Sequence, residues 1–490
     1  MAFGRTTAGA LAALALVLAG PASAALISQG AVRMGADALW SQGFRGSGQV
    51  VAVIDMGFGG LDRSIELGEL PPRAAMTIAS FDATYGLDGR SEIGGLTQHG
   101  ARMAELVHDV APQARLLLAN YHSQAEFRQA VDWALANGAQ IVSHSNSFLT
   151  PPFDGTGDAA RTVDRATAAG VLWVNSVGNY AQRHWSGMAA AAPAVIPIAP
   201  RPGDYLMLSL AWRDPAVRAS VAVERQDPAG WTEVQRSTPD GALGADTERL
   251  LVEGGAWRLV VRQEAGPPAT LRLFSQTTGF GDLAVADGSV PTPADAAGAL
   301  AVGAVPWTET ALAPYSSRGP TDGGRLKPDL VAPTYVTSNP EWPGTAGTSA
   351  ATAHVAGAAA LVREQRVAAG LPVDPASLRT ALMRGAMDLG DPGPDPSFGV
   401  GQIRLDRGRP ALRLWVSSGP RRALRVLASD EGTLRELRVA LDGTPLRTAR
   451  RPYLRLRLPA LPPGRHELRV EAEDMAGNVV ARTRTLRGGR

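Results

Sequence analysis

Four polar residues, far apart in this chain of 490 residues, have side chains that together could carry out acyl transfer. In chain order they are Asp55, His99, Asn179 and Ser349. Acyl transfer to a serine needs a base for the hydroxyl proton and a carboxylate that holds this base in the correct tautomer. It also needs a donor to the developing oxyanion, which a side-chain amide can supply. The four residue types therefore match the four chemical roles.

Each of these residues has a simpler interpretation when it is taken alone. An aspartate at a strand end, which is the position predicted for Asp55, serves equally well as a metal ligand or a phosphate acceptor. Ser349 precedes a helical run of small residues and could be only its N-cap, because serine is among the preferred N-cap residues. Asn179 follows a glycine and could be a turn residue. The elements that position these side chains must decide between the two interpretations.

Apolar, strand-like runs alternate with helical patterns through much of the chain. The runs "QVVAVIDMG", "ARLLLAN", "AQIVSHSNS" and "GVLWVNSVGN" end in polar residues or glycine, and helical patterns at 124–137 and 158–169 lie between them. Short buried strands alternating with helices predict an α/β fold with a parallel sheet. Ligands usually bind at the carboxyl ends of such strands. Asp55 and Asn179 are both expected at strand ends, and His99 is expected at a helix start near the same edge.

Two other stretches have the short alternating segments of antiparallel β-structure. Segments such as "YLMLSLAW" and "WRLVVRQ" are separated by Gly, Pro and Asp turns, after which the α/β pattern resumes. The last 80 residues are again all-β and contain the hairpin signal "LDGTP". We therefore predict five segments: a signal peptide (1–24), the two parts of an α/β domain (25–196 and 289–408), an inserted β-sandwich (197–288) and a C-terminal Ig-like β-sandwich (411–490).

Five blocks in the chain resemble, in order, those of the subtilisin family (subtilases) of serine proteases. "VAVIDMG" is similar to the family's Asp block, "HGARMAELVHDVAPQARL" to its His block and "GTSAATAHVAGAAAL" to its nucleophile block. "IVSHSNS" and "SVGN" resemble the substrate-binding strand and the oxyanion strand. "YSSRGPTDGGRLKPDLVAP" is a further match. The resemblance covers about 30–195 and 290–405, and neither β domain.

The resemblance implies an exported serine endopeptidase that hydrolyses peptide bonds through an acyl-enzyme. It assigns Ser349 as nucleophile, His99 as general acid and base, and Asp55 as the orienting carboxylate. The oxyanion would be bound by Asn179 and by the backbone N–H of Ser349. Strand addition of the substrate would use three neighbouring residues, Ser145, Asn146 and Ser147. The other histidines lie outside these roles, with His354 expected in the core and His144 facing away from the cleft.

Several positions depart from the family pattern without removing a catalytic group. Met56 replaces the usual Thr or Ser after the aspartate, and Ala101 replaces the usual Thr near the histidine. Ala350 and Ala353 stand where Met and Pro are usual. Ser147 stands where a glycine usually opens the first specificity pocket, and its hydroxymethyl group could narrow that pocket toward small side chains. These changes indicate a divergent branch.

The N-terminal segment predicts export. "MAFGRTTAGALAALALVLAGPASA" has a basic start, a short apolar run and a small-residue cleavage pattern. No other segment is long and apolar enough to span a bilayer. A secreted or periplasmic protein that is not an integral membrane protein is therefore expected. Cysteine is absent from the sequence, which excludes disulfides and thiolate catalysis. The short stretch between Ala24 and Gly46 leaves no room for the long pro-region of many secreted relatives.

Charge and composition say little about partners beyond a peptide substrate. The net charge of +2 gives no reason to expect a nucleic-acid partner, and the single lysine, Lys327, is interpreted as a compositional preference for arginine. Residues 411–490 hold 17 arginines against 8 acidic residues. That basic domain could contact a polyanionic cell envelope or the acidic α/β domain, or simply present a solvated strand face. No cofactor is expected, and Ca²⁺ would follow from family resemblance only, because no acidic cluster has calcium-loop spacing.

Two other functions compete with the protease hypothesis. The first is a non-catalytic subtilase-like binding protein that acts through its β domains, although all four catalytic positions are intact. The second is an α/β protein that uses Asp55 for a metal or a phosphate, which explains neither the block around His99 nor the block around Ser349.

Overall fold

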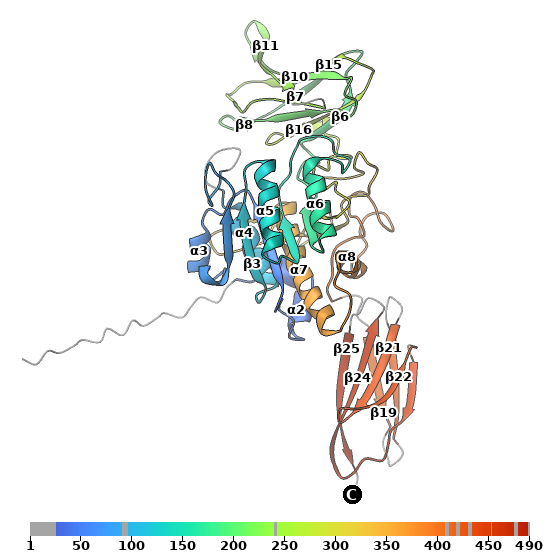
Figure 1. Cartoon of the computed structure of the whole chain (residues 1–490). Helices are drawn as coiled ribbons and strands as arrows, with labels where there is room; N and C mark the ends of the chain where they lie inside the picture. The colour runs from blue at the N-terminus through green and yellow to red at the C-terminus, as the bar shows by residue number, and fades with distance from the viewer. Residues whose placement is uncertain are drawn as a thin grey trace, which may run out of the picture.

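The computed structural model describes residues 26–90, 97–239, 243–406, 411–417, 422–429, 434–451, 453–474 and 479–488. The predicted signal peptide (1–24) lies outside the described residues. Figure 1 shows a central body of helices around a sheet, a body of green strands on one side of it, and a body of orange and red strands on the other. None of the helices in the described ranges is long and apolar enough to cross a membrane.

The central body contains a seven-stranded sheet in the order β18-β17-β5-β4-β1-β3-β2. All of its strand pairs are parallel, which confirms the predicted α/β fold. Its strands in chain order are β1 (Val50–Asp55), β2 (Thr77–Ser80), β3 (Arg115–Asn120), β4 (Ile141–His144), β5 (Leu172–Ser176), β17 (Ala299–Pro306) and β18 (Leu330–Thr334). The predicted catalytic aspartate is therefore the last residue of β1.

Helices cover both faces of this sheet, each over its own apolar cluster. One cluster joins the sheet to α4 (His99–Val110) and α7 (Thr348–Ala368), and the other joins it to α5 (Gln124–Ala136) and α6 (Asp158–Ala168). The remaining helices are α1 (Gln29–Arg33), α2 (Ala36–Trp40), α3 (Leu61–Glu66) and α8 (Pro375–Arg384), with 3₁₀ turns η1 (Arg73–Ala75) and η2 (Gly281–Leu283).

The small residues of α7 are explained by its place in the core. The first 15 residues of this helix are all buried, and it packs against α4 and the central strands. A Cβ atom on Gly357 would lie 2.6 Å from Cβ of Val110 in α4. The run of alanine and glycine therefore lets two helices and a sheet approach closely, as dense core packing requires.

The green body of Figure 1 consists of two main antiparallel sheets over a separate apolar core. Their strand orders are β11-β10-β15-β7 and β12-β13-β9-β16-β6, and β14 and β8 form a small third sheet. Two of the strands, β6 (His184–Met188) and β7 (Ala194–Ile198), start before residue 197. The other strands are β8 (Tyr205–Leu206), β9 (Leu208–Ala211), β10 (Arg218–Asp227), β11 (Gly230–Arg236), β12 (Thr238–Pro239), β13 (Gly244–Asp246), β14 (Leu250–Leu251), β15 (Trp257–Ala265) and β16 (Thr270–Ser275).

The C-terminal body also has two sheets, with strand orders β19-β20-β23 and β22-β21-β24-β25. Buried leucine, valine and alanine side chains from both sheets form its core. The additional β-structure expected here is therefore present, whereas the Ig-like class of this domain stays a prediction. Its strands are β19 (Ala411–Val416), β20 (Ala423–Ser429), β21 (Leu434–Leu441), β22 (Thr444–Ala449), β23 (Tyr453–Arg457), β24 (Gly464–Asp474) and β25 (Val479–Gly488).

Candidate active site

A cavity of about 280 Å³ lies at the carboxyl edge of the central sheet, where β1, β4 and β5 end. Six of the seven residues predicted from the sequence line it, namely His99, Ser145, Asn146, Ser147, Asn179 and Ser349. The seventh, Asp55, contacts His99. Residues separated by almost 300 positions in the chain thus meet at one place.

The carboxylate of Asp55 holds the imidazole of His99. Nδ1 of His99 lies 2.9 Å and 2.8 Å from the two carboxylate oxygens. Gly100 makes this approach possible, because a Cβ atom there would lie 2.5 Å from the carbonyl oxygen of Gly57 and 3.0 Å from Cβ of Asp55. The start of α4 therefore lies directly against the end of β1. With Nδ1 on the carboxylate, Nε2 is the nitrogen left for proton transfer.

Burial and charge act in opposite directions on His99. Asp55 is fully buried, and its Oδ1 also accepts a hydrogen bond of 2.8 Å from the backbone N–H of Met56. Burial disfavours the imidazolium, but the charge of Asp55 and the hydrogen bond to it outweigh this effect, so the pKa of His99 is raised. Arg102 opposes the rise through its positive charge. A histidine with a raised pKa is a stronger base once it is neutral.

Ser349 lies within the first turn of α7 and is not its N-cap. The helix starts at Thr348, and its N-cap is Gly347, whose φ of 101° favours glycine. The simple interpretation of Ser349 as the capping residue is therefore wrong. The N–H group of Ser349, in the first helical turn, has no acceptor within the helix. It is left available as a donor beside the hydroxyl of the same residue.

The hydroxyl of Ser349 is engaged by the neighbouring strand end. It donates to the carbonyl of Ser145 at 3.1 Å, and the hydroxyl of Ser145 donates to the carbonyl of Ser349 at 3.3 Å. Within the described ranges, no hydrogen bond joins Ser349 to His99. Both residues nevertheless line the same cavity.

Asn179 is oriented by the residue that precedes the serine. Its Oδ1 accepts hydrogen bonds from the backbone N–H and the hydroxyl of Thr348, at 2.9 Å and 3.0 Å. The amide oxygen is thereby occupied, and the Nδ2 group is the part of Asn179 that can donate into the cavity. An amide held in this orientation is suited to bind an oxyanion.

Comparison with known proteins agrees with this geometry. The model of the subtilase family of peptidases matches residues 46–199 and 258–401, which is more than half of the chain. The chain belongs to the subtilase family. It is 39% identical over 108 residues to pyrolysin of Pyrococcus furiosus, a stretch that spans 21% of this chain but only 8% of pyrolysin. The structure of the Clostridium perfringens CspB protease has the same fold, with a TM-score of 0.57, 18% identity, and coverage of 77% of this chain and 97% of that one.

One residue that positions the subtilase site was not assigned from the sequence. The hydroxyl of Ser317 accepts a hydrogen bond of 3.0 Å from the N–H of Tyr180, directly after Asn179. Gly178 has a φ of 104°, and a Cβ atom on it would lie 2.8 Å from the same hydroxyl and 2.7 Å from Cδ of Pro291. The glycine is therefore required by this packing. The block "YSSRGP" was the signal for Ser317.

The buried histidines of this subtilase have structural surroundings. His354 donates from Nδ1 to the carbonyl of Ala350 and accepts at Nε2 from the hydroxyl of Ser28, both at 2.7 Å, which confirms a core histidine. His144 lies between the hydroxyl of Tyr121 and the amide oxygen of Asn175, away from the cavity. Burial lowers the pKa of His354 and of His144 to about 4. Neither is placed to act as a base.

No group of three or more His, Asp or Glu side chains in the described part of the chain could hold a metal ion.

Proposed function

We propose that this subtilase is a serine endopeptidase with Asp55, His99 and Ser349 as its catalytic triad. The observation that carries the proposal is the contact of 2.8 Å between Nδ1 of His99 and the buried carboxylate of Asp55, beside a cavity that Ser349 also lines. Pyrolysin is matched over less than a tenth of its length, so the activity assigned to the whole chain rests on this geometry.

In the proposed mechanism, His99 takes the proton of the Ser349 hydroxyl as the oxygen attacks the peptide carbonyl. The carbonyl oxygen becomes an oxyanion, which accepts hydrogen bonds from Nδ2 of Asn179 and the N–H of Ser349. His99 then gives the proton to the departing amine, and an acyl-enzyme forms. Water activated by the same histidine releases the acyl group. Asp55 stays ionised and stabilises the imidazolium throughout.

Substrate binding is proposed at the end of β4. Ser145 and Asn146 are almost fully buried, whereas Ser147 is half-buried and lines the cavity. An extended peptide would add here as a further strand, with its side chains alternating into and out of the cavity. The hydroxymethyl group of Ser147 would limit the first pocket to small side chains.

We also propose export, on the basis of the N-terminal sequence, to the periplasm or the medium. The limits predicted from the sequence are 25–196 and 289–408 for the catalytic domain and 197–288 for the inserted sandwich. Because β6 and β7 pair with strands of this sandwich, we propose that it starts at His184 and that the first part of the catalytic domain ends before this residue. The proposed C-terminal Ig-like domain keeps the limits 411–490. The last of these is the part for which contact with the cell envelope is proposed.

Covalent labelling tests the proposed function directly. Wild-type protein is expected to react with a fluorophosphonate probe, and Ser349→Ala is expected to lose this labelling completely, while the surface control Ser41→Ala labels normally. Mass spectrometry of cleaved peptide libraries should show internal cuts. Equal labelling of wild type and Ser349→Ala would reject the nucleophile, and an unlabelled, inactive wild type would favour the non-catalytic binding protein.

The raised pKa of His99 predicts the pH dependence of this activity. His99 acts as a base only when neutral, so kcat/KM should rise with pH through a pKa above the ordinary value of about 6.5. Arg102→Gln removes a charge that lowers the pKa of His99, so the acidic limb should move to still higher pH. The measurement is a pH profile of kcat/KM for both proteins. An acidic limb below the ordinary value would contradict the Asp55–His99 pair.

Asn179→Ala should lower kcat about 10²- to 10³-fold, because one oxyanion donor is lost. KM should change little, since the interaction forms mainly in the transition state. Thr348→Val is the graded control: it removes only the hydroxyl that contacts Oδ1 of Asn179, and the loss should stay below about tenfold. Steady-state kinetics on one peptide substrate measure both. A comparable increase in KM for Asn179→Ala would indicate instead that Asn179 contributes to substrate binding in the ground state.

A further inference from the structure

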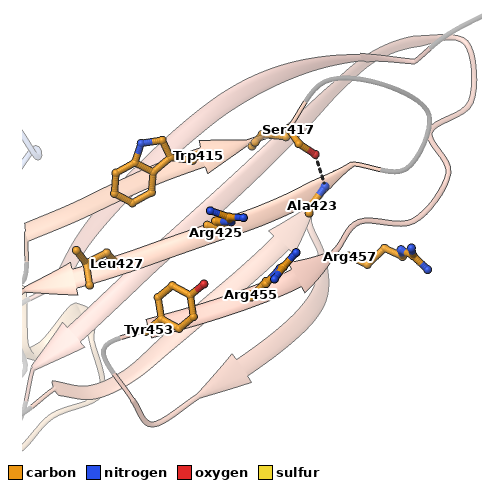
Figure 2. Close-up of a pocket in the computed structure, with 9 residues that line it drawn as sticks. Trp415, Ser417, Ala423, Arg425, Leu427, Tyr453, Arg455 and Arg457 are labelled. Atoms are coloured by element: carbon orange, nitrogen blue, oxygen red, sulfur yellow. Dashed lines mark hydrogen bonds between the residues drawn. The ribbon is translucent and has the colours of Figure 1, made fainter.

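One face of the C-terminal three-stranded sheet carries arginine and aromatic side chains. This sheet belongs to the body of orange and red strands, apart from the central body (Figure 1). A hollow of about 830 Å³ lies over strands β19, β20 and β23. Figure 2 shows its side chains on the same side of the sheet. We call it the arginine face and define it by Trp415, Arg425, Leu427, Tyr453, Arg455 and Arg457.

The strand register places the positive charges side by side. Arg425 in β20 pairs directly with Arg455 in β23, and Trp415 in β19 pairs with Arg425 from the other side. Like charges directly opposite one another destabilise a sheet. The three strands "ALRLWV", "ALRVLAS" and "YLRLR" contain no acidic residue. In the described part of the chain, no ion pair or hydrogen bond involves the side chains of Arg425, Arg455 or Arg457.

On the other sheet of the same domain, three arginines form ion pairs with glutamates, whereas others such as Arg447 and Arg484 form none in the described part of the chain. There, Arg435 and Arg438 both pair with Glu473, at 2.9 Å and 2.6 Å, and Arg469 pairs with Glu471 at 2.7 Å. Among the described residues, some arginines of that sheet therefore have acidic partners, whereas Arg425, Arg455 and Arg457 have none. An anionic ligand would supply the missing charge, and it would relieve the repulsion between Arg425 and Arg455.

Exposed rings flank these charges. Trp415 is 49% exposed and Tyr453 is 48% exposed, the two highest values among the aromatic side chains of the described residues. The two residues are two strands apart and in adjacent rows, so their Cα atoms lie roughly 12 Å apart from the spacing of strands and residues. That separation is larger than the width of a single sugar ring, so a ligand that contacts both aromatic side chains would be a polymer with several sugar units.

We propose that the arginine face binds an acidic polysaccharide, whose carboxylates pair with Arg425 and Arg455 and whose sugar rings stack on Trp415 and Tyr453. The planar guanidinium group matches a carboxylate with two parallel hydrogen bonds. Three large apolar side chains are too few for the apolar centre of a stable protein interface. We choose a carbohydrate over a nucleic acid because the proposed export would place the protein outside the cytoplasm. The proposal does not depend on the proteolytic activity.

Binding of the full chain to polygalacturonate tests the proposal, with fully methyl-esterified polygalacturonate as the matched neutral ligand. Wild type should bind the acidic polymer at least about tenfold more tightly than the ester. Arg425→Glu/Arg455→Glu should lose at least about tenfold in affinity, and Trp415→Ala should lose about three- to tenfold. Arg425→Gln/Arg455→Gln gives a milder version in case the charge reversal unfolds the domain.

The control variant is Arg447→Glu/Arg484→Glu, which changes the same net charge at exposed positions of the other sheet. Its affinity should stay within about twofold of wild type. An equal loss in this control would overturn the proposal, because binding would then depend on overall charge. Absence of polygalacturonate binding would also overturn it, as would preferential binding of oligo(dT) or anionic phosphatidylglycerol vesicles through the same arginines.

Discussion

Replacing His99 by alanine is expected to lower kcat about 10⁶-fold, the order found when the base of a serine triad is removed. His99 is the only histidine that lines the cavity among the described residues, and its Nδ1 lies against the carboxylate of Asp55. No neighbouring side chain can replace it, because His144 faces Tyr121 and Asn175 and has a pKa of about 4. The assay is single-turnover cleavage of an activated ester and a peptide.

The matched control is His122→Ala, which removes an exposed histidine and should change kcat by less than about twofold. A second readout comes from the double variant His99→Ala/Ser349→Ala. Groups that act as a unit are strongly non-additive, so this variant should be no slower than either single variant. More than a hundredth of wild-type activity in a folded His99→Ala protein, or fully additive losses, would contradict the proposed triad.

Much of the central fold and the candidate site could be predicted because strand ends are encoded locally. The apolar run before Asp55 fills β1, which ends at that residue, and the run before Asn179 fills β5, which ends three residues before it, so both runs locate the sheet edge. The parallel arrangement then brings these ends together without further information. Recognition of the block around Ser349 needed only a linear pattern, and the cavity confirms that it lies beside His99.

The remaining features depend on contacts between distant segments. The hydroxyl of Ser349 donates to the carbonyl of Ser145, more than 200 residues away, and no local pattern encodes that choice. The helix start shows the same limit: Gly347 takes the N-cap position because its backbone adopts a positive φ beside Asn179. Propensity alone favoured a serine there. The pairing of β6 (184–188) with β16 in the second body is also non-local.

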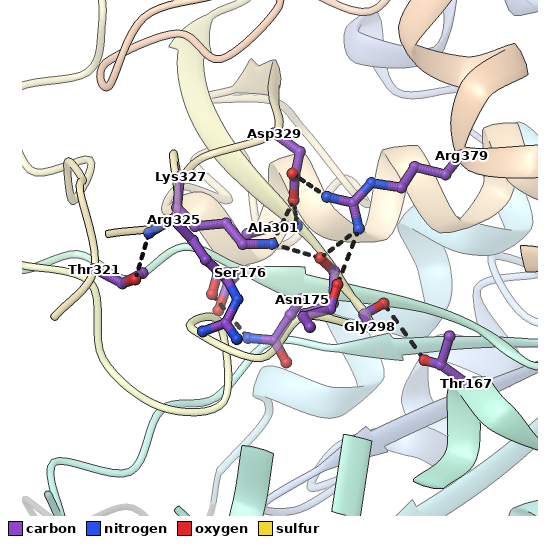
Figure 3. Close-up of polar contacts among 12 residues, drawn as sticks. Thr167, Asn175, Ser176, Gly298, Ala301, Thr321, Arg325, Lys327, Asp329 and Arg379 are labelled. Atoms are coloured by element: carbon purple, nitrogen blue, oxygen red, sulfur yellow. Dashed lines mark hydrogen bonds and ion pairs between the residues drawn. The ribbon is translucent and has the colours of Figure 1, made fainter. Parts of the chain in front are cut away.

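Lys327 has a structural role that composition alone does not indicate. Its side chain is only 2% exposed, and its ammonium group donates to the carbonyl of Ala299 at 2.6 Å and to the carboxylate of Asp329 at 2.8 Å (Figure 3). Arg379 forms an ion pair with the other oxygen of Asp329, and the N–H of Ala301 donates to the first at 2.6 Å. Burial lowers the pKa of Lys327, and the charge of Asp329 opposes this effect.

This network joins β17 to the start of β18, and β17 lies next to β5, which leads into Asn179. Lys327 thus connects the edge strand β18 to β17, the neighbour of the strand that precedes Asn179. An arginine would not fit in place of Lys327, because its planar guanidinium group is larger than the ammonium group that fills this buried position. The single lysine of the chain is therefore a structural requirement.

Lys327→Met should lower the free energy of unfolding of the catalytic domain by about 3–5 kcal/mol, because it leaves a buried carboxylate and a buried carbonyl without their cation. Urea unfolding, monitored at each urea concentration by the loss of fluorophosphonate labelling, reports on the stability of this domain specifically. Lys327→Met/Asp329→Asn should be less destabilised than the sum of its two single variants, since both charges are removed together. The surface pair Arg161–Asp158 provides the control, and Arg161→Gln should cost less than about 1 kcal/mol. If Lys327→Met cost no more than this control, the buried cation would not be holding the sheet edge in place.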